Sequence, residues 1–213
     1  MTDFFLAQYK NADSIQILLE FIVFASGILS VLFAKKENIW VYPTGLLATI
    51  ITTYLLYLAG YLGDMLLNGY FAIMSIYGWY MWGKSRENNQ QLPISRTSKN
   101  EKIIGIAMFF LTLFVVFGVY TAFDQPINPD NYIDILSSGI FFTGMWYMAR
   151  KKIENWTLWI IGDAIVVPLY LYRGLGMLAL QYIIFTILAV FAYIEWHKTL
   201  KNQTLIKTAQ NEY

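Results

Sequence analysis

Two tryptophans and one aspartate, all within an apolar stretch, have a spacing that could bind a cationic ring. Trp156, Trp159 and Asp163 stand at positions i, i+3 and i+7, which share one face of an α-helix. With a rise of about 1.5 Å per residue, Asp163 lies about 10 Å further along the helix than Trp156. A carboxylate so deep in an apolar helix attracts a cation, and indole faces stack on cationic rings. The pattern therefore predicts a binding site for a cationic ring.

A structural role is the alternative for each of these residues. Trp156 and Trp159 would then belong to the aromatic belt at a membrane surface, and Asp163 would bond to a neighbouring helix. Glu20, in the first apolar stretch, either snorkels to the membrane surface or pairs with a polar partner. The sequence alone leaves both roles open.

Two other apolar stretches carry polar side chains that we expect in the interior of a helix bundle. Asn68 and Ser75 are spaced i, i+7, and Trp79 follows one turn later. Gln181 and Tyr182 are neighbours in the last stretch. Such amides and hydroxyls alternatively hold helices together. The predicted binding residues are Trp156, Trp159, Asp163, Asn68, Ser75, Trp79, Gln181 and Tyr182.

The composition predicts an integral membrane protein. The chain has 213 residues, of which 57% are hydrophobic and 14% charged, whereas a soluble domain is about 25% charged. A soluble protein this short could not bury so much apolar surface. The net charge of +1 gives no reason to expect a nucleic-acid partner. The absence of cysteine excludes thiolate metal sites and a cysteine nucleophile.

Seven apolar stretches have the length of a transmembrane helix, which needs about 20 residues. They predict an all-α fold with spans at 14–34, 39–59, 62–83, 103–123, 131–149, 156–172 and 175–196. The start of the chain lacks a basic region and a small-residue cleavage site, so we expect the first span to direct insertion itself. Of the fifteen Lys and Arg residues, all but Lys10 and Arg173 fall on one side of these spans. The N-terminus is therefore predicted outside and the C-terminus inside.

An internal repeat accounts for the presence of seven predicted spans. The stretches from Ser26 and from Ser138 both open with Ser-Gly-Ile, pass a Lys-Lys pair near Asn and Trp, and end at Trp82 and Trp196. The offset drifts from 112 to about 117 and back to 114. Two parallel three-helix repeats joined by a linker helix (3+1+3) would place a ligand near the bilayer midplane. The predicted parts are an outer segment 1–13, repeats 14–83 and 131–196, a solvated cytoplasmic loop 84–102, a linker helix 103–123 and a cytoplasmic tail 197–213.

The sequence resembles the PnuC family of bacterial vitamin transporters along nearly its whole length. The resemblance rests on "IYGWYMW" at 76–82, on "ENWTLWIIGDAIVVPLYLYRGL" at 154–175 and on the 3+1+3 plan. Its most specific element is Trp-x-x-Trp-x-x-x-Asn/Asp at Trp156, Trp159 and Asp163. It implies a fold similar to a full-length relative of the SWEET sugar transporters, a homotrimer, and a place in the bacterial cytoplasmic membrane. It also implies a facilitator that needs no cofactor, with a cytoplasmic kinase trapping the substrate.

The family's substrates include nicotinamide riboside, thiamine and riboflavin, of which the first two contain cationic aromatic rings. This chain has Asp163 where some nicotinamide riboside members have Asn, and Asn68 and Ser75 where they have Gln and Asn. The resemblance implies nicotinamide riboside first and thiamine as the alternative. A transporter driven by protons on Asp163 and Glu20 is a further alternative. An enzyme is not expected, because the only histidine, His197, follows the last span and Asp163 has no paired aspartate in another span.

Overall fold

Seven α-helices, and no β-strand, make up the part of the chain that the structure describes. This structure is a computed structural model, and it describes residues 13–58, 62–87, 92–122 and 128–211. The helices are α2 (Ser14–Lys35), α3 (Val41–Leu58), α4 (Leu62–Glu87), α5 (Lys99–Ala122), α6 (Pro129–Ala149), α7 (Glu154–Tyr172) and α8 (Gly176–Asn211). Each predicted span falls on one of them, which confirms the all-helical fold.

Four of these helices, α2, α3, α5 and α8, are long and apolar enough to cross a membrane. The other three, α4, α6 and α7, carry most of the buried polar side chains in the described residues, namely Ser75, Ser137, Ser138, Thr143, Asn155 and Asp163. A polar side chain inside an apolar bundle faces other helices and not lipid. The less apolar helices therefore line the interior.

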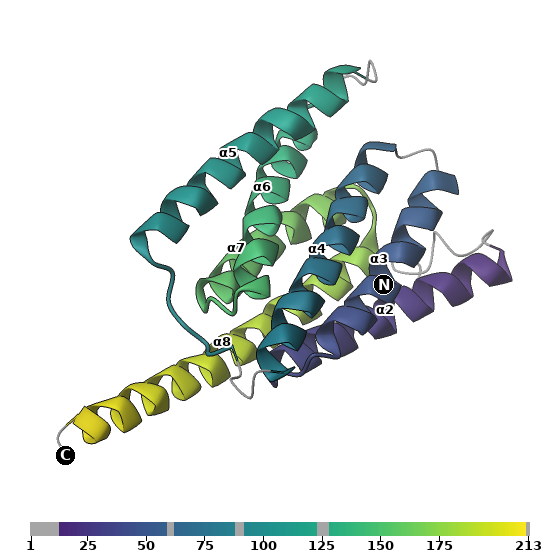
Figure 1. The fold of residues 1–213 in the computed structure, drawn as a ribbon. Coiled ribbons are helices and arrows are strands. Elements are labelled where there is room, and N and C mark those ends of the chain that lie inside the picture. The colour runs from purple at the N-terminus through teal and green to yellow at the C-terminus, as the bar shows by residue number, and fades with distance from the viewer. Residues whose placement is uncertain (1–12, 59–61, 88–91, 123–127, 212–213) are drawn as a thin grey trace.

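The helices form a closed cycle of contacts with one helix outside it (Figure 1). The first half, α2 to α4, and the second half, α6 to α8, each pack in chain order, and the cycle closes where α2 meets α8 and α4 meets α6. Helix α5 packs mainly on α6. Gly105 allows this approach, because a side chain there would collide with the Tyr147 hydroxyl. Helix α5 is therefore an addition to a six-helix core.

The segment 92–98 is docked on the protein, so the prediction of a solvated loop is wrong for these residues. The Ser95 amide donates to the Lys151 carbonyl at 3.1 Å, and the Ile153 amide donates to the Ser95 carbonyl at 3.0 Å. Ile94 is only 2% exposed. Residues 88–91 lie outside the described part of the chain. We call the face that contains 92–98 and the connections after α2 and α6 the loop-side face.

Helix α8 continues well past its predicted end at residue 196. Its 36 residues span about 54 Å, whereas a bilayer core is about 30 Å thick. Figure 1 shows its C-terminal part extending beyond the other helices. The predicted tail 197–213 is thus helical as far as Asn211. Its polar composition hid this, because the apolar run that marks the span ends at Trp196.

Two buried tryptophans connect the halves on the loop-side face. Trp82 at the end of α4 donates its indole N–H to the Ala149 carbonyl, the last of α6, at 3.2 Å. Trp196 of α8 donates to the carbonyls of Ala34 and Lys35, the last of α2, at 3.2 Å each. Final helix carbonyls have no partner within their own helix, so an indole donor satisfies a group that is costly to bury.

An arginine holds α6 to the α7–α8 connection on the opposite face. Arg173 donates from Nε and Nη2 to Asp130 Oδ2 at 2.9 and 2.6 Å, and from Nη1 and Nη2 to the two carboxylate oxygens of Asp134 at 3.1 and 2.6 Å. The hydrogen bonds from Arg173 lower the pKa of Asp130. Both carboxylates come from the second half, so this cluster stabilises that half internally.

We predict that the Arg173 cluster makes folding stability depend on acid pH. A carboxylate whose pKa is lowered in the folded state stabilises the fold above its ordinary pKa of about 4, and this contribution is lost as the pH falls below that value. Arg173→Gln should lower Tm by about 2–4 °C at pH 7 and flatten the acid limb of a Tm-against-pH curve. Asp130→Asn serves as the matched control and should give part of the same loss. An acid limb unchanged in Arg173→Gln would contradict the prediction.

Candidate substrate-binding site

Asp163 is a buried carboxylate with an unused hydrogen-bonding position in the middle of α7. It is 1% exposed, and nine residues separate it from either end of the helix. Within the described residues its Oδ1 atom has no hydrogen-bond partner. An unpaired buried carboxylate costs several kcal/mol, typically about 3–5 when a partner is removed. A residue retained at such a cost is a candidate for ligand binding.

An aromatic wall from α6 stands beside Asp163. Phe141 stacks on Trp159 with ring centroids 5.2 Å apart and an interplanar angle of 28°. Gly162 makes this possible, because any side chain there would collide with the Phe141 ring. Trp159 is one helical turn from Asp163 and shares its face. The Trp159 indole N–H is buried and lacks a partner among the described residues. The wall thus combines flat apolar surface with a free donor.

Trp156 lies in a different environment, at the loop-side end of α7. It is 1% exposed and meets Trp196 edge-on, with centroids 5.4 Å apart. It belongs to the apolar core around Trp82, Met145 and Ala149. Its indole N–H has no partner in the described residues. Burial in this core indicates a structural part for Trp156, inside the bundle and not in a surface belt.

The residues predicted on α4 separate into interior and exterior positions. Ser75 is 2% exposed, and a Cβ atom at Gly45 of α3 would lie 3.9 Å from its hydroxyl. Trp79 is 43% exposed, so the expectation that it reaches the interior is wrong. The buried stripe of α4 runs through Met74, Gly78 and Trp82, and Trp79 lies about 100° away from Gly78 around the helix. Asn68 is half-buried.

The residues predicted on α8 lie where the helix meets its neighbours. Tyr182 joins the aromatic cluster, with its ring centroid 6.1 Å from that of Phe141 and 5.1 Å from that of Tyr170. Gln181 faces α2, because a Cβ atom at Gly27 would lie 3.4 Å from its Nε2 atom. Both side chains are half-buried. Both residues thus lie at contacts between helices, and their contact with a ligand stays a prediction.

Glu20 is occupied elsewhere. Its carboxylate accepts a hydrogen bond of 2.9 Å from Gln16, one turn earlier on α2. No group of three or more His, Cys, Asp or Glu residues that could hold a metal occurs in the part of the chain that the structure describes. These two observations place the candidate chemistry on Asp163 and its aromatic neighbours.

Phe141 and Tyr70 are site candidates that the sequence did not indicate. Tyr70 of α4 stacks on Phe142 of α6 with ring centroids 3.5 Å apart and an angle of 6°. Its buried hydroxyl has no partner in the described residues. Aromatic residues make up 18% of the chain, so no pattern distinguishes these two from the rest. Phe141, together with Trp159 and Asp163, supplies flat surface, an indole donor and one carboxylate, which suit a flat cationic ligand.

We predict that the two motif tryptophans respond differently to substitution. Trp159→Ala should weaken binding of a pyridinium ring such as 1-methylnicotinamide by about tenfold, because a desolvated cation–π contact contributes about 1–2 kcal/mol. Trp156→Ala should instead lower the free energy of unfolding by about 3–5 kcal/mol. Tryptophan fluorescence titration and thermal melts separate the two effects, with Trp156→Phe as the matched control. Equal melting temperatures and equal affinities in both Ala variants would refute the assignment of ligand binding to Trp159 and of a structural role to Trp156.

Comparison with known proteins identifies the family of the chain. A family model described as nicotinamide mononucleotide transporter matches residues 17–198. The chain is 25% identical over 194 residues to the nicotinamide riboside transporter PnuC of Escherichia coli strain K12, covering 80% of this chain and 81% of that protein. It is 21% identical over 177 residues to the riboflavin/roseoflavin transporter RibM of Streptomyces davaonensis, covering 80% of each.

A solved structure agrees with the fold. The crystal structure of the vitamin B3 transporter PnuC superposes with a TM-score of 0.71 at 22% sequence identity, covering 92% of this chain and 86% of that one. At this identity the likeness establishes the fold. The family that the resemblance at 76–82 and 154–175 implied is confirmed by the family match over residues 17–198. The chain belongs to the nicotinamide mononucleotide transporter family, and it is similar to the PnuC protein of Escherichia coli along most of its length.

Proposed function

We propose that this protein takes up nicotinamide riboside across the bacterial cytoplasmic membrane by facilitated diffusion. The observation that carries the proposal is the buried Asp163 carboxylate, whose Oδ1 atom has no partner in the described residues, beside the Trp159–Phe141 stack. A pyridinium ring supplies the missing positive charge and a flat face for the stack. The similar Escherichia coli protein is named for nicotinamide riboside.

The remaining polar groups suit the uncharged parts of that substrate. Nicotinamide riboside carries a carboxamide and ribose hydroxyls, which need donors and acceptors when they leave water. The free Tyr70 hydroxyl and Trp159 indole N–H offer donors, and Gln181 offers an amide at the α2–α8 contact. Such groups would discriminate against a ligand of the same charge that lacks these hydroxyls. With that ligand bound, the protein's buried donors and acceptors would stay unpaired, which is costly.

A 3+1+3 plan with seven spans is part of this proposal. Contacts on the loop-side face recur at a separation of 114 residues: Tyr42 meets Trp82 edge-on at 5.2 Å and 87°, as Trp156 meets Trp196 at 5.4 Å and 87°. Glu37 and Lys151, also 114 apart, have φ angles of 53° and 50°. The cycle supports the same relation, since α2–α8 and α4–α6 are equivalent contacts between parallel repeats. The offset of 114 at these pairs lies within the drift from 112 to about 117 in the sequence match.

The position of the contacts between the halves supports a proposal of alternating access. On the loop-side face, Lys151 Nζ lies 2.8 Å from Glu37 Oε2 and 4.5 Å from the Trp82 ring centroid. These contacts add to the three hydrogen bonds that the Trp82 and Trp196 indoles make between the halves. The Arg173 cluster on the other face stays within the second half. We therefore propose that the loop-side face is closed in this conformation, and that opening it separates Glu37 from Lys151.

Orientation and assembly complete the proposal. With the N-terminus outside, the loop-side face is cytoplasmic, which agrees with the excess of Lys and Arg on that side. A cytoplasmic kinase would then trap the substrate by phosphorylation, and no catalytic role is assigned to the chain itself. The family resemblance supports a homotrimer. Exposed apolar residues on α5, such as Phe114 at 82% exposure, are available to lipid or to other subunits.

We predict that purified protein binds nicotinamide riboside saturably and in preference to thiamine and riboflavin. Asp163→Asn should weaken binding of the cation by about tenfold or more, but binding of its uncharged dihydro form by much less, because only the first loses an ion pair. Isothermal titration with both forms measures the difference. Glu20→Gln is the matched control and should change neither affinity.

Equal losses for the two forms would show that Asp163 does not recognise charge. Preference for thiamine or riboflavin would reassign the substrate while leaving the family unchanged. Uptake into vesicles that collapses when a protonophore is added would overturn facilitated diffusion in favour of proton coupling.

We predict that breaking the Glu37–Lys151 ion pair opens the loop-side face. The chain has no cysteine, so a single reporter at the buried position 75 (Ser75→Cys) can be labelled by an impermeant maleimide from that side. Lys151→Met should increase the labelling rate several-fold, and exchange of the two charges (Glu37→Lys with Lys151→Glu) should reverse the increase. Lys152→Met is the matched control, because Lys152 pairs with Glu101 at 2.9 Å and not with the first half. Equal labelling in both Met variants would argue against this gate.

A further inference from the structure

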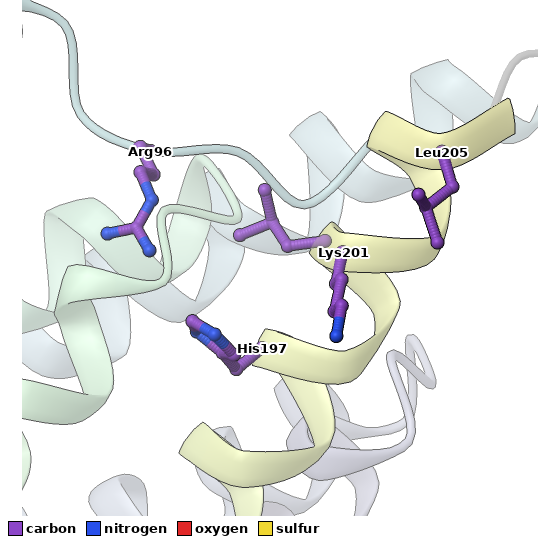
Figure 2. A pocket seen from close by; sticks show the side chains of 5 residues that line it. Arg96, His197, Lys201 and Leu205 are labelled. Atoms are coloured by element: carbon purple, nitrogen blue, oxygen red, sulfur yellow. The ribbon is translucent and has the colours of Figure 1, made fainter. Parts of the chain in front are cut away.

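A groove on the loop-side face brings together three basic side chains from two distant parts of the chain. Arg96 comes from the segment before α5, and His197 and Lys201 come from the C-terminal part of α8. The groove has a volume of about 250 Å³, and Leu200 and Leu205 complete its lining. In Figure 2 the side chains of Arg96, His197 and Lys201 border one open space. No residue of the candidate substrate site lines it.

The backbone on both sides of the groove is held in place. Arg96 lies between Ser95, whose backbone bonds to the connection after α6, and Thr97, whose amide donates to Glu154 Oε2 at 3.0 Å. His197 follows Trp196, which is fully buried and bonded to the end of α2. Lys201 is one turn after His197 and shares its face of α8. A ligand therefore meets a backbone that is already ordered, so binding has only the side chains to order.

The groove has an excess of positive charge. Within the described residues no salt bridge involves Arg96, His197 or Lys201. Glu154, an acidic residue beside this segment, accepts a hydrogen bond from the Thr97 amide. Gathered basic groups raise the local potential and attract anions. All three side chains are exposed to solvent, so an anion can reach them.

We propose that this groove binds a phosphate group. A guanidinium presents paired donors that match phosphate oxygens, an ammonium supplies a point charge, and imidazole offers an N–H in either protonation state. Leu200 and Leu205 suit a ligand with an apolar or flat portion attached. Two sources share this chemistry: the headgroup of an anionic phospholipid in the adjoining leaflet, and a soluble phosphomonoester. The proposal does not depend on which vitamin the protein carries.

Binding of defined phosphate probes to the full chain tests the site. One arm measures glycerol 3-phosphate binding to detergent-purified protein by thermophoresis. The other counts phosphatidylglycerol molecules retained by native mass spectrometry after extraction from mixed phosphatidylcholine–phosphatidylglycerol vesicles. Arg96→Gln and Lys201→Gln should each weaken binding by about fivefold, since a basic residue near an anionic surface contributes about 1 kcal/mol. Lys198→Gln is the matched control: the same charge is lost from an exposed position of α8 outside the groove.

The outcomes are distinct. Loss in Arg96→Gln and Lys201→Gln but not in Lys198→Gln supports the groove, and the arm in which it occurs identifies lipid or soluble phosphate as the source. An equal loss in Lys198→Gln shows diffuse surface charge and overturns the proposal, as does wild-type protein that binds neither probe. Thermal melts confirm that each variant is folded. Nicotinamide riboside affinity, measured on the same samples, reports separately on the proposed transport site.

Discussion

Burial of polar groups in apolar surroundings governs this structure. Where lipid replaces water, each buried donor or acceptor has to find its partner within the protein. The ends of α2 and α6 show how this is met: their last carbonyls accept the indole N–H groups of Trp196 and Trp82, which come from the opposite halves. Satisfying helix ends in this way also joins the halves. The contact between halves therefore follows from a local requirement of the backbone.

Half of the exceptions to this rule among the described residues belong to the candidate site, while the Tyr42 hydroxyl, Asn155 Oδ1 and the Trp156 indole N–H lie outside it. In the described residues, the atoms left without partners include Asp163 Oδ1, the Trp159 indole N–H and the Tyr70 hydroxyl. Stability alone would favour apolar replacements at such positions. A transporter needs such groups to replace the hydration of its substrate during passage. The folding free energy that these unpaired groups cost is therefore consistent with a role in transport.

The two faces of the bundle have different electrostatic organisation. The loop-side face joins the halves through Glu37 and Lys151, while on the opposite face Arg173 bonds to two carboxylates of its own half. A gate has to break bonds between moving parts and preserve those within each part. The proposed conformational change uses this difference, and the basic groove at Arg96 lies on the gated face without taking part in the gate.

Much of this protein could be predicted from sequence. Long apolar stretches determine helices, because only internal backbone bonding is tolerated in lipid, and the resemblance at 76–82 and 154–175 indicated the family. Tertiary structure decided which motif residues share an environment. It placed Trp159 against Phe141 and Trp156 against Trp196, and it turned Trp79 outward. It also docked 92–98 and extended α8. The aromatic pairs and the docked segment depend on contacts between residues far apart in the chain, such as Phe141 beside Gly162. Helical periodicity carries no information about the partner that a face will meet.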